Sequence, residues 1–232
     1  LSSVGHELRT PLNAILGFAQ LLLRDQKRPL DERQSARLEH VIRGGEHLLR
    51  LINDLLDLSK IEAGKREFEF GPLRLADVAH EALRFVEPQA QRGRVDVMLD
   101  LKYSPVIKAD ERAVRQILIN LLSNAVKFSD AGAIVILFCD VDDEGRTLLG
   151  VKDTGRGMSD EMQTKAVEPF AQSGDVFTVE GYGTGLGLPI VKGLAEAHQG
   201  RLCIESALGL GSKIWVEFPT ERLIRRSTAA AA

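Results

Sequence analysis

The chain has 232 residues, of which 44% are hydrophobic and 27% charged, so it can bury a core and is not expected to be disordered. Its 30 basic and 33 acidic residues leave a formal net charge of −3, which argues against nucleic-acid binding. Two cysteines are too few for a disulfide framework or a zinc site. No apolar run approaches the about 18 residues of a membrane span. These features predict that this fragment is cytoplasmic and makes no membrane contact, while membrane anchoring of the full-length protein stays open.

Residues 1–64 have a helical pattern, already under way at Leu1, so we expect the chain to be a fragment of a longer protein. The first helix should bend at Pro11, because proline removes one backbone hydrogen bond. A turn follows, with Asp31 as N-cap of a second helix over 32–63, and Gly64 ends that helix. The two amphipathic helices should pack antiparallel. We expect them to dimerise into a four-helix bundle; packing against the chain's own second domain is the alternative.

From residue 65 onward the pattern changes to alternating strands and helices. We expect a two-layer α/β sandwich over residues 65–220 and a low-complexity tail over 221–232. The expected strands cover residues 68–70, 94–101, 133–140, 147–152, 201–206 and 213–218. The expected helices cover residues 75–91, 110–128, 159–166 and 187–198.

His6 is the first residue that indicates chemistry. It is followed directly by the carboxylate Glu7 inside the first helix. A neutral imidazole can attack phosphorus, and an adjacent carboxylate can orient the ring and take its proton. A lone histidine on a helix is more often a surface or capping residue, so this pattern acquires meaning only from the motifs downstream.

Asn120, Asn124 and Lys127 are spaced by four and three residues in the helix over 110–128 and therefore share one face. Two amides and an ammonium group on one face suit phosphate oxygens and a hard cation. A solvated polar face is the alternative, although asparagine is a poor helix former.

Two glycine-rich segments follow. Asp153 ends a strand and precedes Gly155 and Gly157, so the backbone there can approach a planar ligand, and the Asp153 carboxylate can accept from an adenine amino group. An ordinary tight turn is the alternative. Gly183, Gly185 and Gly187 precede a helix whose N-terminal amides can hold phosphates, and the polar stretch 171–180 before them is expected to form a mobile lid. A dinucleotide-binding fingerprint would need a preceding strand, and the Walker lysine is absent.

In this order the motifs resemble those of the sensor histidine kinases of two-component systems. Residues 5–13 are similar to the phosphoacceptor box, 116–128 to the asparagine box and 153–157 to the first glycine box. Residues 168–170 are similar to the phenylalanine box, 183–188 to the second glycine box and 209–212 to the last one. The resemblance covers nearly the whole chain, and six motifs in the expected order are very specific. It implies a dimerisation and phosphotransfer hairpin over residues 1–64, followed by a Bergerat-type ATP-binding fold.

The resemblance also implies roles for single residues. His6 would be the phosphoacceptor, Glu7 its general base, and Thr10 would support phosphatase activity. Asn124 would coordinate Mg²⁺. The implied ATP-binding residues are Asn120, Asn124, Lys127, Asp153, Gly155, Gly157, Phe170, Gly183, Thr184, Gly185, Leu186, Gly187 and Ser212.

The implied function is ATP-dependent autophosphorylation of His6 and transfer to an aspartate of a response-regulator receiver domain. Candidate hinges are the bend at Pro11 and the linker at 64–65, and the handedness of the turn near Pro29 decides whether ATP reaches its own chain's His6 or the partner's. Gly5, Tyr182 and Ser212 depart from the common motif residues without removing expected chemistry. The rival functions are an ATPase clamp of the same nucleotide fold and a catalytically inactive dimeric scaffold.

Overall fold

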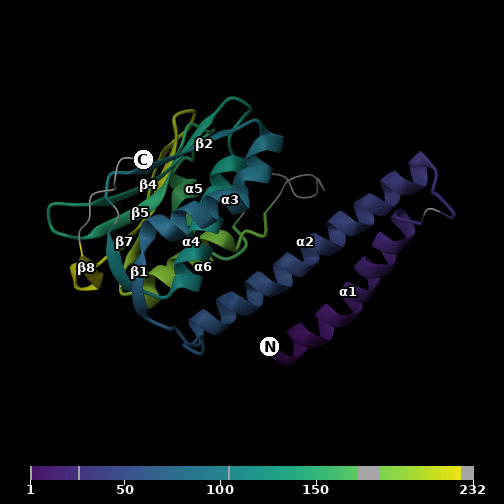
Figure 1. Ribbon diagram of the computed structural model, residues 1–232, viewed down its shortest axis with the longest axis horizontal. Helices are drawn as coiled ribbons and strands as arrows, with labels where there is room; N and C mark the ends of the chain where they lie inside the picture. Colours follow the sequence, from purple (N-terminus) through teal and green to yellow (C-terminus); the bar gives the residue numbers. More distant parts are fainter. Residues whose placement is uncertain (1, 26, 104, 172–182, 226–232) are drawn as a thin grey trace.

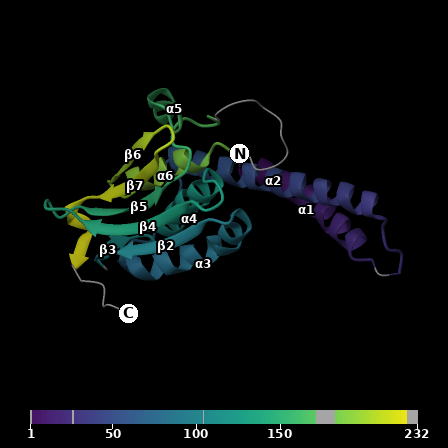
Figure 2. The same cartoon turned by 90° about the horizontal axis from the view of Figure 1, so that it is seen from above.

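The computed structural model describes residues 2–25, 27–103, 105–171 and 183–225. A helical hairpin projects from an α/β domain, as Figures 1 and 2 show from two directions. The hairpin consists of α1 (Ser2–Leu23) and α2 (Glu32–Glu62). The elements of the α/β domain are, in chain order, β1 (Gly71–Arg74), α3 (Leu75–Gly93), β2 (Asp96–Leu101), β3 (Val106–Ala109), α4 (Glu111–Lys127), β4 (Ile134–Val141), β5 (Thr147–Asp153), α5 (Asp160–Lys165), α6 (Gly187–Ala197), β6 (Arg201–Ala207), β7 (Gly211–Phe218), the 3-10 turn η1 (Thr220–Arg222) and β8 (Leu223–Arg225).

The ends of α2 are defined by local hydrogen bonds that the sequence predicts. Asp31 forms a capping box with Gln34: its carboxylate accepts from the Gln34 amide at 2.7 Å, and the Gln34 side chain accepts from the Asp31 amide at 3.1 Å. At the other end Gly64 has a φ of +63°. Its amide donates a hydrogen bond to the Ile61 carbonyl, and the Lys65 amide donates to the Lys60 carbonyl. This pattern is a Schellman motif, in which glycine avoids the steric cost of left-handed backbone.

The α/β domain has two layers, as predicted. A five-stranded sheet has the order β2-β4-β5-β7-β6, in which β2 and β4 are parallel and the other pairs are antiparallel. Helices α3, α4 and α6 cover one face of this sheet and enclose the main core (Figure 1). A smaller antiparallel sheet has the order β1-β3-β8. Because β8 pairs with β3, residues 223–225 belong to this small sheet although the predicted tail begins at residue 221.

The strand predicted over residues 68–70 is wrong: this segment is irregular, and β1 begins at Gly71. The alternation has another cause. The rings of Phe68 and Phe70 stack on each other at 5.8 Å, and both contact the ring of His198 edge-on. The amide of Glu69, between them, donates to Asp110 Oδ2 at 2.7 Å. A side chain therefore accepts the hydrogen bond that a neighbouring strand would otherwise take.

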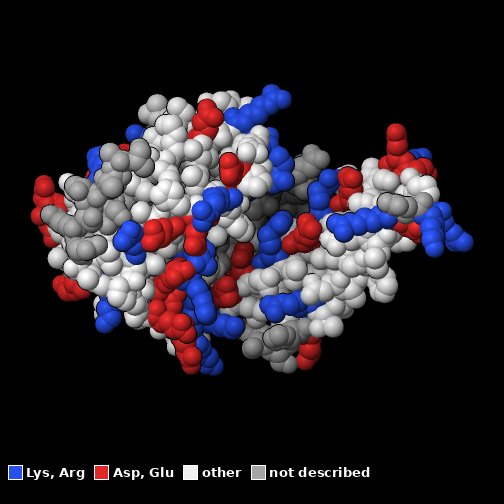
Figure 3. Space-filling view, viewed as in Figure 1, with Lys and Arg blue, Asp and Glu red and all other residues white. Residues whose placement is uncertain are grey.

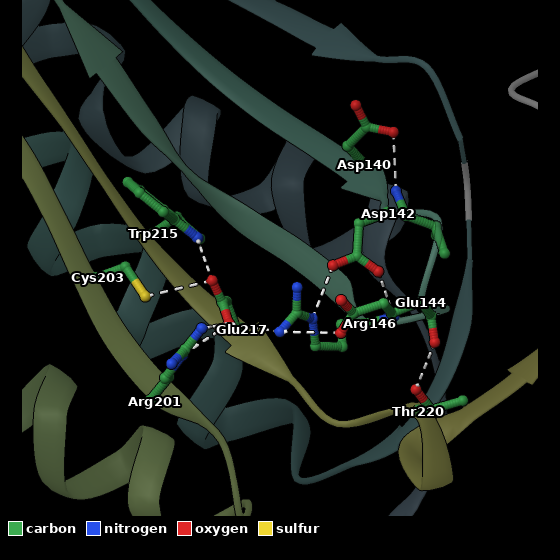
Figure 4. A network of polar contacts seen from close by, with 10 residues as sticks. Asp140, Asp142, Glu144, Arg146, Arg201, Cys203, Trp215, Glu217 and Thr220 are labelled. Atoms are coloured by element: carbon green, nitrogen blue, oxygen red, sulfur yellow. Dashed lines mark hydrogen bonds and ion pairs between the residues drawn. The ribbon is translucent and has the colours of Figure 1, made fainter.

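Glu217 organises the sheet face opposite the helices (Figure 4). Its carboxylate lies 2.7 Å from Arg201 Nε and 3.3 Å from the Trp215 indole nitrogen, and Cys203 Sγ donates to it at 3.4 Å. Burial acts to raise the pKa of Glu217, but these bonds, chiefly that from Arg201, outweigh burial and leave the pKa lowered. The charged carboxylate therefore ties β6 to β7 on the outer face.

The hairpin buries little of its apolar surface. Among the residues whose burial is described, Gly5, Leu12, Leu16 and Ala19 are buried on α1, and Leu58 is buried on α2. Among the described residues of the hairpin, nine large apolar side chains are exposed: Leu8, Ile15, Phe18, Leu21, Leu22, Leu23, Val41, Leu48 and Leu55. Among the described residues, no helix combines the length and the apolar character that a bilayer span needs.

Candidate nucleotide-binding cleft

A cleft of about 1760 Å³ lies between α2 and the helical layer of the α/β domain. Figure 3 shows a hollow between the hairpin and the α/β domain, with basic and acidic side chains around it. Most of the predicted ATP-binding residues line this cleft: Asn120, Asn124, Lys127, Asp153, Gly157, Phe170, Gly183, Thr184, Gly185, Gly187 and Ser212. Segments more than a hundred residues apart along the chain therefore meet at one surface.

Helix α4 supplies the polar face that the sequence predicts. Asp110 caps it by accepting from the Ala113 amide at 2.8 Å. The opposite face of α4 is buried in the core, which turns Asn120, Asn124 and Lys127 toward the cleft. Asn120 Nδ2 lies 3.5 Å from the carbonyl oxygen of Gly187, the first residue of α6. The two amides thus lie beside a helix N-terminus, where backbone N–H groups favour anions.

Lys127 has an unusually low affinity for its proton. Burial, followed by the positive charge of Arg156, lowers its pKa to about 8. Both cations lie over the ring of Phe128, Lys127 Nζ at 4.8 Å and the Arg156 guanidinium carbon at 4.6 Å from its centroid. A phosphate in the cleft would offset the repulsion between them.

Asp153 ends β5 and is 8% exposed. Its Oδ1 accepts from the amide of Gly155 at 2.9 Å and from the amide of Ser212 at 3.2 Å. Burial raises the pKa of Asp153, and these two bonds partly oppose the shift. Both bonds end on Oδ1, which leaves Oδ2 available to a donor in the cleft.

Two glycines explain how close the backbone segments approach each other here. Gly157 has a φ of +66° and packs against the carbonyl of Ala207, while Gly211 has a φ of +89° and packs against the carbonyl of Asp153. A Cβ at either position would collide with backbone, and a left-handed φ disfavours any other residue. The first glycine segment is therefore held against the β6–β7 turn.

The glycine segment after the predicted lid is tied to α2. Thr184 Oγ1 donates to Asp54 Oδ2 at 2.8 Å and accepts from the Leu186 amide at 3.2 Å. Gly185, at a φ of +69°, accepts from the Phe170 amide at 3.1 Å. The two flanks of the predicted lid therefore touch, while residues 172–182, including most of that lid and Tyr182, lie outside the described residues.

Two of the predicted ATP-binding residues do not line the cleft. Gly155 lies beneath it, where its amide holds Asp153, and a Cβ there would stand 2.5 Å from the Phe128 carbonyl oxygen. Leu186 is fully buried and packs in the core. Both positions support the cleft from behind.

His6, Glu7 and Thr10 lie on α1, away from the residues that line the cleft. Arg9 Nη2 donates to Asn53 Oδ1 at 2.7 Å, and Gly5 packs against Leu56. The backbone of His6 is therefore level with the turn of α2 that contains Asp54; its side chain lies outside the described residues. Gly5, which departs from the common motif residue, leaves room for the end of the Leu56 side chain.

Sequence reasoning missed the contribution of α2 to the cleft. Arg43, His47, Arg50 and Asp54 line it from the hairpin side. Their spacing of four, three and four residues puts them on one helical face, so the polar side of α2 carried the signal. The apolar stripe of the same helix had drawn attention to dimerisation instead.

Comparison with known proteins agrees with this architecture. Residues 1–64 match the family model described as the His Kinase A (phospho-acceptor) domain, and residues 109–222 match that of the histidine kinase-, DNA gyrase B- and HSP90-like ATPases. The chain belongs to the histidine kinases of two-component systems, with both of these domains.

Among curated relatives, the circadian input-output histidine kinase CikA of Synechococcus elongatus is 42% identical over 228 residues. The cell-division control histidine kinase PdhS of Brucella suis is 38% identical over 237 residues. Each alignment covers 97% of this chain but 30% and 23% of the relative, so the chain spans about a quarter of their length.

Two solved structures are similar over most of the chain. Full-length ShkA in complex with AMPPNP is 32% identical, with a TM-score of 0.77, over 99% of this chain and 46% of ShkA. The histidine kinase AdeS of Acinetobacter baumannii is 25% identical, with a TM-score of 0.66, over 94% of this chain and 98% of AdeS.

Proposed function

We propose that this chain binds ATP in the cleft, transfers the γ-phosphoryl group to His6, and passes it on to an aspartate of a response-regulator receiver domain. The observation that carries the proposal is the hydrogen bond from Thr184 to Asp54. It joins the glycine segment beside the phosphate side of the cleft to the turn of α2 that is level with His6. The proposed phosphate site and the backbone of the proposed acceptor His6 thus lie at the same height of the hairpin.

In this proposal Asp153 accepts from the adenine amino group, and the phosphates run toward Lys127 and the N-terminus of α6. The amide oxygen of Asn124 fits Mg²⁺, which keeps most of its water and phosphate ligands and needs few protein oxygens. When bound, Mg²⁺ neutralises charge on the phosphates. A cluster of three carboxylate, histidine or cysteine ligands is not found among the described residues, and this mode of binding does not need one.

The remaining steps belong to the chain's own groups. Glu7 orients the imidazole of His6 and removes its proton as the ring attacks phosphorus, while the bond to the leaving ADP oxygen breaks. Because α2 lies between α1 and the cleft, the α/β domain has to move, and the irregular linker after Gly64 is the proposed hinge. Phosphoryl transfer depends mainly on such positioning. Thr10, one turn after His6, supports the reverse dephosphorylation of the receiver domain.

The test is incubation of the chain with γ-labelled ATP and Mg²⁺. We expect acid-labile label on the wild type and on His40→Gln, which changes an exposed histidine of α2, and no label on His6→Gln. Affinity for AMPPNP should be the same in all three. Label that persists on His6→Gln would contradict the phosphoacceptor assignment.

The same assay extends to the reverse step. Thr10→Ala should label normally but release phosphate from a phosphorylated receiver domain several-fold more slowly, because the residue that orients the attacking water is missing. Equal loss of both activities would count against a separate phosphatase role for Thr10.

A further inference from the structure

The α2 face of the cleft carries basic groups outside the motifs of the ATP-binding domain. His47 and Arg50 line the cleft from α2, opposite Lys127 on α4. The three groups are close enough to interact: burial lowers the pKa of His47, and the charges of Arg50 and Lys127 lower it further. Two elements from different domains thus direct positive charge into one space.

Two acids of α2 lie on the same side of the cleft. Asp54 accepts from the Thr184 hydroxyl; burial raises its pKa, and the Thr184 bond and the charge of Arg50 partly oppose that shift. Glu46 also lines the cleft. Arg50 is exposed and forms no salt bridge with another described residue. A guanidinium that faces a cleft and an opposing lysine is a binding group for a phosphate.

The direction of the cleft indicates which phosphate of a bound nucleotide would reach Arg50. Asp153 marks the adenine end in the β5 region, and Lys127 with the α6 N-terminus follows. Helix α2 forms the wall on the hairpin side, so the group that reaches it is the last one of the nucleotide chain.

We propose that Arg50, assisted by His47, binds the γ-phosphate of the nucleotide held in the cleft, from the hairpin side of the domain boundary. This inference rests on the proposed ATP site. The bound triphosphate then bridges the hairpin and the α/β domain: α6 and Lys127 hold it from one side and α2 from the other. Arg50 is a positioning residue that holds the docked arrangement of the two domains.

The experiment measures the affinity of the whole chain for AMPPNP and ADP, each with Mg²⁺, by calorimetry. Arg50→Ala should weaken AMPPNP binding about three- to tenfold, the range for one charge-assisted contact in a partly solvated site, and ADP binding less. Arg50→Lys should restore part of the loss. Arg37→Ala, which removes an exposed arginine of α2 outside the cleft, should match the wild type for both nucleotides.

Unchanged AMPPNP affinity in Arg50→Ala would overturn the proposal while leaving the proposed function intact. Equal weakening of AMPPNP and ADP would also overturn it, because the contact would not be with the γ-phosphate. Wild-type chain that binds neither nucleotide would instead defeat the proposed function itself.

A second readout separates bridging from a local structural role. Hydrogen exchange of the α2 segment around residues 43–54 should slow when AMPPNP is added, and less so with ADP. In Arg50→Ala this difference between the nucleotides should vanish. Slowing that is identical in wild type and Arg50→Ala would contradict bridging through Arg50.

Discussion

The backbone around Asp153 holds its carboxylate in an orientation that suits the proposed role in adenine recognition. The amides of Gly155 and Ser212 hold Oδ1, so the orientation of the carboxylate is fixed before a ligand arrives. Burial makes its charged form costly, which increases the gain when a donor reaches Oδ2. A pre-oriented acceptor of this kind selects for a ligand with an amino group at that point.

Asp153→Asn should therefore reduce the affinity for AMPPNP by roughly ten- to a hundredfold. In this variant the side-chain NH₂ takes the position of Oδ2, so two hydrogen-bond donors, this group and the adenine amino group, would face each other. The Asn oxygen can still accept from Gly155, so the unfolding temperature should change little. Isothermal calorimetry and thermal unfolding check both expectations. Asp143→Asn, on the exposed β4–β5 turn, is the matched control. Equal affinities for the two variants would remove Asp153 from ligand recognition.

At the scale of elements, a buried histidine joins three segments that are distant in sequence. His198, fully buried at the end of α6, donates from Nδ1 to the Leu194 carbonyl at 2.8 Å, and its Nε2 accepts from the Asp110 amide at 3.1 Å. The rings of Phe68, Phe70 and Phe218 surround it. The ring is neutral in this arrangement, because Nε2 must accept. Burial lowers its pKa most, and Arg222 lowers it further.

The stability of the chain should therefore fall on acidification. Above about pH 6.5, the pKa of an exposed histidine, neither state is protonated at this site. As the pH falls below that value, His198 binds a proton in the unfolded chain but stays neutral in the folded chain. The free energy of unfolding then drops by at most about 1.4 kcal/mol per pH unit, until the folded pKa is reached.

Urea unfolding between about pH 7.5 and pH 5 measures this slope. His198→Gln keeps an acceptor near the Asp110 amide but cannot titrate, so its slope should be shallower than that of the wild type. Parallel slopes would show that other groups are responsible. The Asp110 carboxylate titrates lower: burial acts to raise its pKa, but bonds from the Glu69 and Ala113 amides outweigh burial and lower it.

Elements with strong periodicity and caps were predictable, and those held by distant partners were not. Helix α4 lies within two residues of its predicted bounds, because Asp110 caps it and its apolar face is continuous. The wrongly predicted strand at 68–70 and the unpredicted strands β3 and β8 depend on distant partners instead of local signals. β3 and β8 are short and pair with each other across more than a hundred residues. Local alternation carries no information about such a partner.

At the scale of the whole molecule, the hairpin leaves much of its apolar surface without a partner. Phe18 and Leu21 on α1 are 69% and 66% exposed, and Val41 on α2 is 51% exposed. Helix α2 uses its end near Leu58 to pack on the α/β domain, so part of the alternative predicted from sequence is realised there. The outer part of the hairpin still requires a second hairpin, and we expect a homodimer.

Phe18→Asp should weaken this dimer at least tenfold, because a carboxylate would be buried between apolar helices. Sedimentation equilibrium of the whole chain checks the association constant. The matched control is Leu208→Asp, which changes an apolar side chain of similar exposure (67%) on the β6–β7 turn, outside the hairpin and the cleft lining. A wild-type chain that stays monomeric, or equal dissociation of both variants, would contradict dimerisation through α1.

The site was predictable where one segment carried a motif, and not where the fold joins two domains. The spacing of four and three residues was enough to predict that Asn120, Asn124 and Lys127 share one helical face, and all three line the cleft. Arg50 belongs to the cleft because α2 docks beside α6, and nothing in the local sequence around Arg50 encodes that docking. The spacing of Arg43, His47, Arg50 and Asp54 marks a polar face on α2, but it does not identify the element that lies opposite that face.

The end of α2 belongs to two structures at once. Leu58 and Ile61 pack into the core of the α/β domain, and Ile61 lies against Gly193 of α6, where a Cβ would stand 2.7 Å from it. Any movement of the α/β domain that carries the cleft toward His6 must first expose the side chains of Leu58 and Ile61 to water. Exposure of apolar surface raises the heat capacity, so the undocked state is penalised mainly through water, with a temperature dependence of its own. We therefore expect the equilibrium between docked and separated domains to depend on temperature through this contact.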